Sequence, residues 1–134
     1  MALTIICVTG PGSTGKSSII RDFTANHLKY VKVAGDVLGI FPMPRRDYAI
    51  GVTGSGDNLN FILEGRRFLL RYRGLRAMIV ACRSEGRTLE EVRRFAKSEK
   101  ADLHEIETRK ISGARDRNAA IAVNVARIKR LLPR

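Results

Sequence analysis

The stretch that decides the fold of this chain is LTIICVTGPGSTGKSSIIRDFTANHL, residues 3–28. It begins with a short apolar and β-branched run, which is typical of a buried strand over residues 3–9. It ends with apolar residues that recur at helical spacing, which predicts a helix over residues 16–28. Residues 10–17, GPGSTGKS, therefore form a glycine-rich turn between a strand and a helix.

This turn matches the pattern G-x-x-x-x-G-K-[ST] at every fixed position. Glycines let the backbone bend tightly and bring its N–H groups against phosphate oxygens, and the helix dipole adds to the attraction. In such a turn Lys16 contacts the β- and γ-phosphates, and the Ser17 hydroxyl is a ligand of Mg²⁺. An ordinary glycine-rich turn is the alternative, which the strand-to-helix context disfavours. The predicted nucleotide-binding residues are Gly10, Gly12, Ser13, Thr14, Gly15, Lys16, Ser17 and Ser18.

On these residues the chain resembles the P-loop NTPase superfamily, and more loosely its small kinase-like members. The resemblance is specific over residues 3–28 and continues only as a pattern of strands and helices. It implies binding of Mg²⁺ with ATP or another nucleoside triphosphate, and transfer of the γ-phosphate to water or to an acceptor. The Asn-Lys-x-Asp pattern of guanine recognition is missing at residues 108–110, where many relatives contact the base, so a GTP-specific switch is disfavoured.

The rest of the chain alternates short apolar runs with longer amphipathic ones. Strands are expected at residues 3–9, 30–34, 48–53, 76–82 and 103–107, helices at 16–28, 58–73, from 88 through 95 and at 115–132, and mainly loop at 35–47. Strands that alternate with helices favour parallel pairing through right-handed crossovers. We therefore expect a single domain over residues 1–134, an α/β/α three-layer sandwich with a mainly parallel sheet of about five strands.

Composition narrows the class of protein. The 134 residues suit one domain, 44% are apolar, and no apolar run approaches the roughly 20 residues of a membrane span. The start has no basic leader before its apolar run, which predicts no signal peptide. Cys7 and Cys82 each lie inside an apolar run, so we expect buried, reduced thiols in a cytoplasmic protein without a membrane partner.

Positive charge is concentrated in the second half of the chain. The net charge is +12, and residues 66–134 carry 19 basic and 8 acidic groups, a net of +11. This asymmetry suggests a polyanionic partner, either nucleic acid or a phosphorylated substrate. Arg67 and Arg71 share one face of the predicted helix 58–73 and are candidates for phosphate-backbone contacts. The alternative is a solvated, arginine-rich outer face.

The acid that should help to hold Mg²⁺ is irregular. In P-loop proteins an apolar strand ends in Asp, but here Thr53 ends the third predicted strand. Asp57 is the first acid after it and the first candidate, with a helix N-cap as its other role. Asp36, at the end of the predicted strand 30–34, is the second candidate, with a turn aspartate as the alternative.

Ligands of open α/β sheets bind outside the carboxyl ends of the strands, so loops expected there supply further candidates. Arg83 and Arg87 follow the fourth predicted strand and could neutralise charge on the transferred phosphoryl group. Glu85 could orient the attacking water or hydroxyl. Arg45 and Arg46 could bind an anionic acceptor. For each of these side chains a solvated surface role is the alternative.

The sequence thus predicts an enzyme that uses Mg-ATP for γ-phosphoryl transfer, by hydrolysis or by kinase-like transfer to an anionic acceptor. The alternative is a nucleotide-gated module for nucleic-acid binding or assembly, with slow or no turnover, in which nucleotide changes the homo-oligomeric state. A degenerate P-loop that binds nucleotide without chemistry is disfavoured by the intact Lys16 and Ser17.

Overall fold

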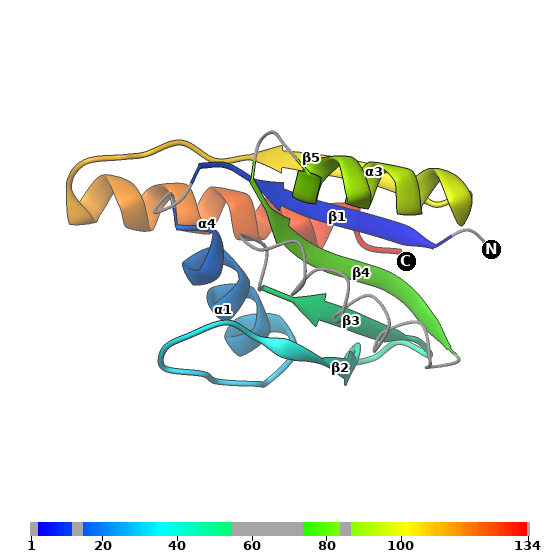
Figure 1. The fold of residues 1–134 in the computed structure, drawn as a ribbon. Coiled ribbons are helices and arrows are strands. Elements are labelled where there is room, and N and C mark those ends of the chain that lie inside the picture. The colour runs from blue at the N-terminus through cyan, green and yellow to red at the C-terminus, as the bar shows by residue number, and fades with distance from the viewer. Residues whose placement is uncertain (1–2, 12–14, 55–73, 84–86, 134) are drawn as a thin grey trace.

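The fold is an α/β fold with a five-stranded, mixed and mostly parallel sheet. Figure 1 shows a computed structural model, which describes residues 3–11, 15–54, 74–83 and 87–133. Its elements are β1 (Thr4–Thr9), α1 (Lys16–His27), β2 (Leu38–Pro42), β3 (Ala49–Thr53), β4 (Leu75–Cys82), α3 (Arg87–Ser98), β5 (Asp102–Glu107) and α4 (Ala114–Leu131). The helix expected at 58–73 lies outside the described residues.

The sheet has the order β2-β3-β4-β1-β5. β1 pairs in parallel with β4 on one side and β5 on the other, and β3 pairs in parallel with β4. All six residues of β1 are buried, as expected of a central parallel strand whose two faces are both covered. The end of β1, where the glycine-rich turn begins, is therefore anchored inside the sheet, between β4 and β5.

Helices cover both faces of this sheet. Successive side chains of a strand point to opposite faces, so β1 contributes to two separate apolar clusters. Ile6 and Val8 pack with residues of α1 and α4 on one face, and Ile5 and Cys7 pack with α3 on the other (Figure 1). The described helices thus number three, with α1 and α4 side by side. None of them is both long enough and apolar enough to span a membrane.

The expected thiol state is confirmed. Cys7 and Cys82 are free and buried, on the face that α3 covers. The pKa of Cys7 is raised, because its thiol interacts with the Cys82 side chain and because burial disfavours the thiolate.

One predicted strand is wrong. Residues 30–34 alternate like a strand, but they form no strand, and Val31 and Val33 are 76% and 93% exposed. The strand forms instead at Leu38–Pro42, inside the region expected to be mainly loop, where it pairs antiparallel with β3. The neighbouring strand and the turn between them decide this position, because strand propensity depends on context.

α4 is longer than the sheet it covers. Its 18 residues extend over about 27 Å at 1.5 Å per residue, and its buried residues, Val125 and Ile128, lie in its second half. Its first half extends past the carboxyl ends of β1 and β5 (Figure 1). This part of α4 therefore forms a wall beside the start of α1.

Candidate functional site

Where the glycine-rich turn follows β1, its described backbone is held by a hydrogen bond and by the conformation of one glycine. The Gly10 N–H donates to the Cys82 carbonyl at 3.2 Å, which ties the turn to the end of β4. Gly15 caps α1 with φ 86° and ψ 15°, a left-handed conformation that favours glycine. Among the described residues, the first turn of α1 has neither a side-chain cap nor an acidic residue, and such a helix start favours an anion. Gly12, Ser13 and Thr14 lie outside the described residues.

Lys16 is the buried cation of this turn. Its side chain belongs to a residue that is only 6% exposed, and its Nζ donates to the Gly10 carbonyl at 2.8 Å and to the Cys82 carbonyl at 3.4 Å. A buried ammonium group is stable only when such acceptors replace water. The positive charge is thus held inside the turn, where the motif expects phosphate oxygens.

Ser17 meets a carboxylate from another loop. Its hydroxyl donates to Asp36 Oδ1 at 2.7 Å. Asp36 also lies against the residue that follows β3, since a Cβ atom on Gly54 would come within 3.6 Å of Asp36 Oδ1. The Gly54 N–H donates to the Val37 carbonyl at 2.8 Å and fixes this approach. Asp36 therefore brings a carboxylate to the carboxyl end of β3, where the strand itself ends in Thr53.

Two basic side chains from α1 and the loop after it, Arg21 and Lys32, hold the backbone around Asp36 in place. Lys32 Nζ donates to the Asp36 carbonyl at 2.6 Å, and Arg21 of α1 donates to the Gly35 carbonyl at 2.7 Å. The expectation that Asp36 ends a strand is wrong, because the chain between α1 and β2 is a loop. The loop nevertheless brings Asp36 to the predicted metal ligand Ser17.

The pair fits a magnesium ion. Neighbouring oxygens of an octahedral Mg²⁺ site with bonds of 2.0–2.1 Å lie about 2.9 Å apart, close to the 2.7 Å between Ser17 and Asp36. Within the described ranges no group of three or more His, Cys, Asp and Glu side chains could hold a metal. Magnesium does not need one, since it is usually bound through one or two carboxylates together with substrate phosphates.

A groove of about 520 Å³ adjoins the start of α1. It lies between α1, the loop after β5 and α4, and Gly15 and Ser18 are among its lining residues. The Thr108 N–H and hydroxyl both donate to the Thr9 carbonyl at 2.7 Å, so the loop after β5 is fixed to the end of β1. The volume is that of a typical small-ligand site. Three arginines line the groove: Arg109, Arg117 and Arg127.

The predicted catalytic residues lie only partly within the described chain. Arg83 and Arg87 are exposed, and Arg83 directly follows Cys82, whose carbonyl contacts the glycine-rich turn. Thr88 lies inside α3, and its hydroxyl accepts a hydrogen bond from the Arg83 N–H at 3.4 Å, which ties the end of β4 to the start of α3. Asp57, Glu85, Arg67 and Arg71 lie outside the described residues.

The expected position of Arg45 and Arg46 is wrong. Both residues lie in the turn from β2 to β3. This turn precedes β3, so it lies at the amino ends of the parallel strands, whereas the glycine-rich turn lies at their carboxyl ends. Arg46 lines a hollow of about 220 Å³ with Lys129 and Arg130 from the end of α4. The antiparallel strand β2 causes the difference, because it carries the chain back across the sheet.

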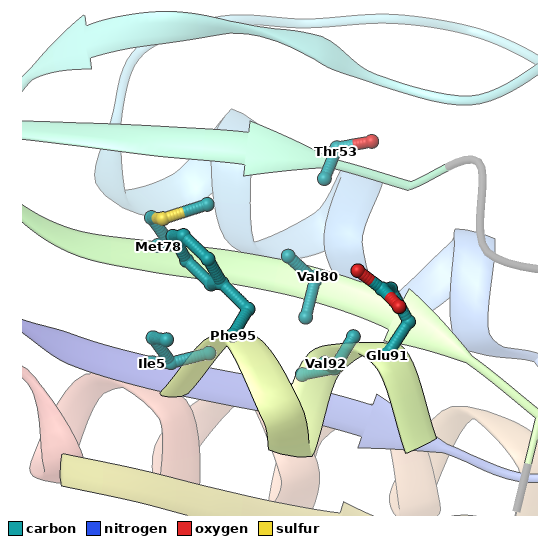
Figure 2. A pocket seen from close by; sticks show the side chains of 7 residues that line it. All are labelled: Ile5, Thr53, Met78, Val80, Glu91, Val92 and Phe95. Carbon is teal, nitrogen blue, oxygen red and sulfur yellow. The ribbon is translucent and has the colours of Figure 1, made fainter. Parts of the chain in front are cut away.

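A small cavity on the α3 face is not a second ligand site. Figure 2 shows Thr53 at the end of β3 and Glu91 and Phe95 from α3 around it. The cavity measures about 20 Å³, which is room for one water molecule. Within the part of the chain that the structure describes, the buried hydroxyl of Thr53 has no hydrogen-bond partner. Among the described residues, β3 ends in Thr53 and Gly54 without a carboxylate of its own, and the described carboxylate that contacts Ser17 is that of Asp36.

The arginines of the groove are candidates that sequence reasoning missed. Arg109 was available from the loop after the last strand, but Arg117 and Arg127 lie on a helix that the sequence predicts only as an amphipathic element. Their shared position depends on how α4 packs beside α1.

Comparison with known proteins adds nothing to these candidates, because no family model, curated protein or solved structure matches the chain.

Proposed function

We propose that residues 1–134 form a single three-layer domain of the P-loop NTPase type that binds Mg-ATP and transfers its γ-phosphoryl group. The observation that carries this proposal is the meeting of two features at one end of the sheet. Lys16 is buried in the glycine-rich turn, and the Ser17 hydroxyl is 2.7 Å from Asp36. A phosphate-binding turn with an adjoining pair of magnesium ligands is the minimum that Mg-ATP chemistry requires.

The binding step follows from the hydrogen bonds of Lys16. Its Nζ contacts two backbone carbonyls in the free protein. A phosphate oxygen is a charged acceptor and therefore a stronger partner than either neutral carbonyl. The N–H groups at the start of α1, uncapped by side chains, bind further phosphate oxygens.

The metal site consists of Ser17 and Asp36, and Asp57, the first candidate from the sequence, is the further acid that could join them. Bound Mg²⁺ would neutralise charge on the β- and γ-phosphate oxygens. Asp36 is held by its neighbours before metal arrives, since Lys32 and Arg21 fix the backbone on either side of it. The site therefore needs little reorganisation, which favours binding.

In the chemical step an acceptor oxygen bonds to the γ-phosphorus, the bond from the γ-phosphorus to its bridging oxygen breaks, and ADP leaves. The acceptor is water or the hydroxyl or phosphate group of an anionic substrate. Arg83 and Arg87 are the cations proposed to stabilise the charge that develops, and Arg83 directly follows Cys82, whose carbonyl contacts the glycine-rich turn. Glu85 stays the proposed group for orienting the acceptor.

The groove beside Gly15 and Ser18 is the proposed place for the nucleoside. It starts at the turn that would hold the phosphates, and its volume of about 520 Å³ is sufficient for a base and a ribose. Ile19 and Ile121 give it apolar surface, and Asn118 and Asn124 bring side-chain amides that can donate and accept hydrogen bonds.

Phosphorus NMR of the products tests this function. Purified protein is incubated with Mg-ATP, alone and with nucleosides, nucleotides and oligonucleotides as acceptors. We expect the γ-phosphorus signal of ATP to be replaced by that of free phosphate or of a new phosphoester, and the Lys16→Ala variant to leave ATP intact. An unchanged spectrum in every mixture, together with no binding of Mg-ATP, would contradict the proposal.

A second candidate is a nucleotide-gated binding or assembly module. An apolar segment of the loop before Asp36 favours it. In this segment Tyr30, Val31 and Val33 have exposed fractions of 41%, 76% and 93%. Metal binding at Asp36 would act directly on this apolar segment. Binding of Mg-ATP without turnover, accompanied by a nucleotide-dependent change in sedimentation, would favour this candidate over the enzyme.

A further inference from the structure

The groove beside α1 has more positive charge than a nucleoside needs. A base and a ribose are neutral, yet three arginines line the groove and Glu107 is the acid among its described lining residues. Within the described parts of the chain, the guanidinium groups of Arg109, Arg117 and Arg127 make neither a hydrogen bond nor an ion pair. Unpaired guanidinium groups at a ligand-sized groove are a donor set for phosphate, which they can bind through two parallel hydrogen bonds.

The three arginines are distributed along the groove. Arg127 follows Arg117 by ten positions on α4, which separates their backbones by about 15 Å. Arg109 enters from the loop after β5 and not from α4. This distribution extends positive charge along the groove beyond the start of α1, so it favours a ligand that has a further phosphate there in addition to its 5′ phosphates.

The walls of the groove are fixed independently of these arginines. Thr108 is hydrogen-bonded to Thr9 at the end of β1, and α4 packs along α1 (Figure 1). Ile121 of α4 is partly buried against the core that contains Ile19 and Ile20 of α1. The guanidinium groups therefore extend from a rigid frame, which lowers the entropic cost of binding.

We infer that the groove binds a nucleotide that has a further phosphate beyond its 5′ chain, either on the ribose or as the next phosphodiester of a strand. The inference rests on the proposed function, because it requires the 5′ phosphates at Gly15 and Lys16. The base and the ribose lie between the glycine-rich turn and the arginines, and Arg109, Arg117 and Arg127 bind the further phosphate.

A binding series with one shared base tests this inference. Dissociation constants are measured at one salt concentration and with excess Mg²⁺ for ADP, ADP with a 2′-phosphate, ADP with a 3′-phosphate, and the dinucleotide with a 5′-diphosphate. The guanosine series is measured in parallel. The variants are Arg109→Gln, Arg117→Gln, Arg127→Gln and Lys16→Ala, and Arg94→Gln on the opposite face of the sheet is the matched control for loss of one charge.

The expected result is that the further phosphate tightens binding to the wild type and to Arg94→Gln by about tenfold or more, the gain of one hydrogen bond between charged groups. The three groove variants lose most of this gain while their affinity for ADP changes by less than about threefold, since ADP has no phosphate there. A gain limited to the ribose phosphates identifies a small nucleotide, and a gain limited to the dinucleotide identifies a strand end.

Two results would overturn the inference without touching the proposed function. In one, ADP and its phosphorylated forms bind the wild type equally. In the other, each arginine substitution weakens all ligands by the same factor, which means that the arginines stack on the base and bind no phosphate. Failure of the proposed function is distinct, since then neither Mg-ATP nor ADP binds, and Lys16→Ala changes nothing.

Discussion

The glycine-rich turn and the arginine groove lie side by side, but their positive charges are held in different ways. Lys16 is 6% exposed and bonded to two backbone carbonyls, whereas Arg109, Arg117 and Arg127 are exposed. The two described ends of the turn are held before ligand binds, by the hydrogen bond from the Gly10 N–H to the Cys82 carbonyl and by the left-handed conformation of Gly15. The groove depends on the packing of α4 beside α1. Under the proposed function, this difference separates a turn that binds any nucleoside triphosphate from a groove that selects among nucleotides.

The largest effect expected is the loss of phosphate binding in Lys16→Ala. Mg-ATP at one hundred times its dissociation constant should stabilise the wild type by about 2.7 kcal/mol, and the variant by close to zero. Thermal unfolding with and without nucleotide measures this, with Lys97→Ala on the exposed face of α3 as the control.

Only the nucleotide-dependent shift should be compared, because the substitution also leaves the Gly10 and Cys82 carbonyls without this donor. An unchanged shift would remove Lys16 from the site. It would also make the groove, and not the turn, the region that binds nucleotide.

Asp36→Asn tests the proposed metal site. The amide still accepts the Ser17 hydrogen bond but loses the charge that Mg²⁺ requires. We expect the magnesium-dependent gain in ATP affinity to fall by about tenfold, equal to about 1.4 kcal/mol, in isothermal titration.

Affinity measured in EDTA should stay close to that of the wild type. Asp57→Asn is the companion variant. If it abolishes the magnesium-dependent gain and Asp36→Asn does not, the metal carboxylate is Asp57, and the contact between Ser17 and Asp36 is structural.

The glycine-rich turn could be predicted from sequence because its chemistry is local. Residues 3–28 contain the strand, the turn and the helix in one continuous stretch, and the observed β1 and α1 agree with the predicted elements to within one residue. Lys16 and Ser17 follow from the spacing of the pattern alone.

The remainder depends on contacts between distant segments. Asp36 approaches Ser17 and Gly54 only because the chain crosses from α1 to the far edge of the sheet before β2 begins. Because of the same connection, the second strand forms at Leu38–Pro42 and not at the predicted residues 30–34. Arg45 and Arg46 therefore lie at the amino ends of the parallel strands. No local spacing in the sequence records such pairings.

A third prediction separates the groove from the arginine-rich stretch at residues 66–76. If Arg67 and Arg71 contact a single strand of nucleic acid, their joint replacement with Gln reduces the salt slope of binding by about 1.4. Between 50 and 200 mM salt the fall in affinity then becomes about sevenfold smaller. Fluorescence anisotropy with a labelled oligonucleotide measures the slope. An unchanged slope in this variant, with a reduced one in Arg117→Gln, would assign strand binding to the groove.

The smallest effect expected concerns the amino ends of the parallel strands, away from the glycine-rich turn. The Tyr48 hydroxyl donates to the Pro133 carbonyl and joins the turn before β3 to the end of α4. Tyr48→Phe should lower the free energy of unfolding by about 1 kcal/mol, the usual contribution of one hydrogen bond, and leave ATP affinity unchanged. Urea unfolding and titration with Mg-ATP measure the two quantities. A large loss of affinity would show that this edge is coupled to the site.

The most direct measurement is a crystal structure of the protein with Mg²⁺ and a non-hydrolysable ATP analogue. The account predicts that Lys16 Nζ leaves the Gly10 carbonyl for the β- and γ-phosphates, that Ser17 and Asp36 lie at the metal, and that the base and the ribose occupy the groove beside Gly15 and Ser18. A nucleotide bound elsewhere, with Lys16 still bonded to Gly10 and Cys82, would contradict it.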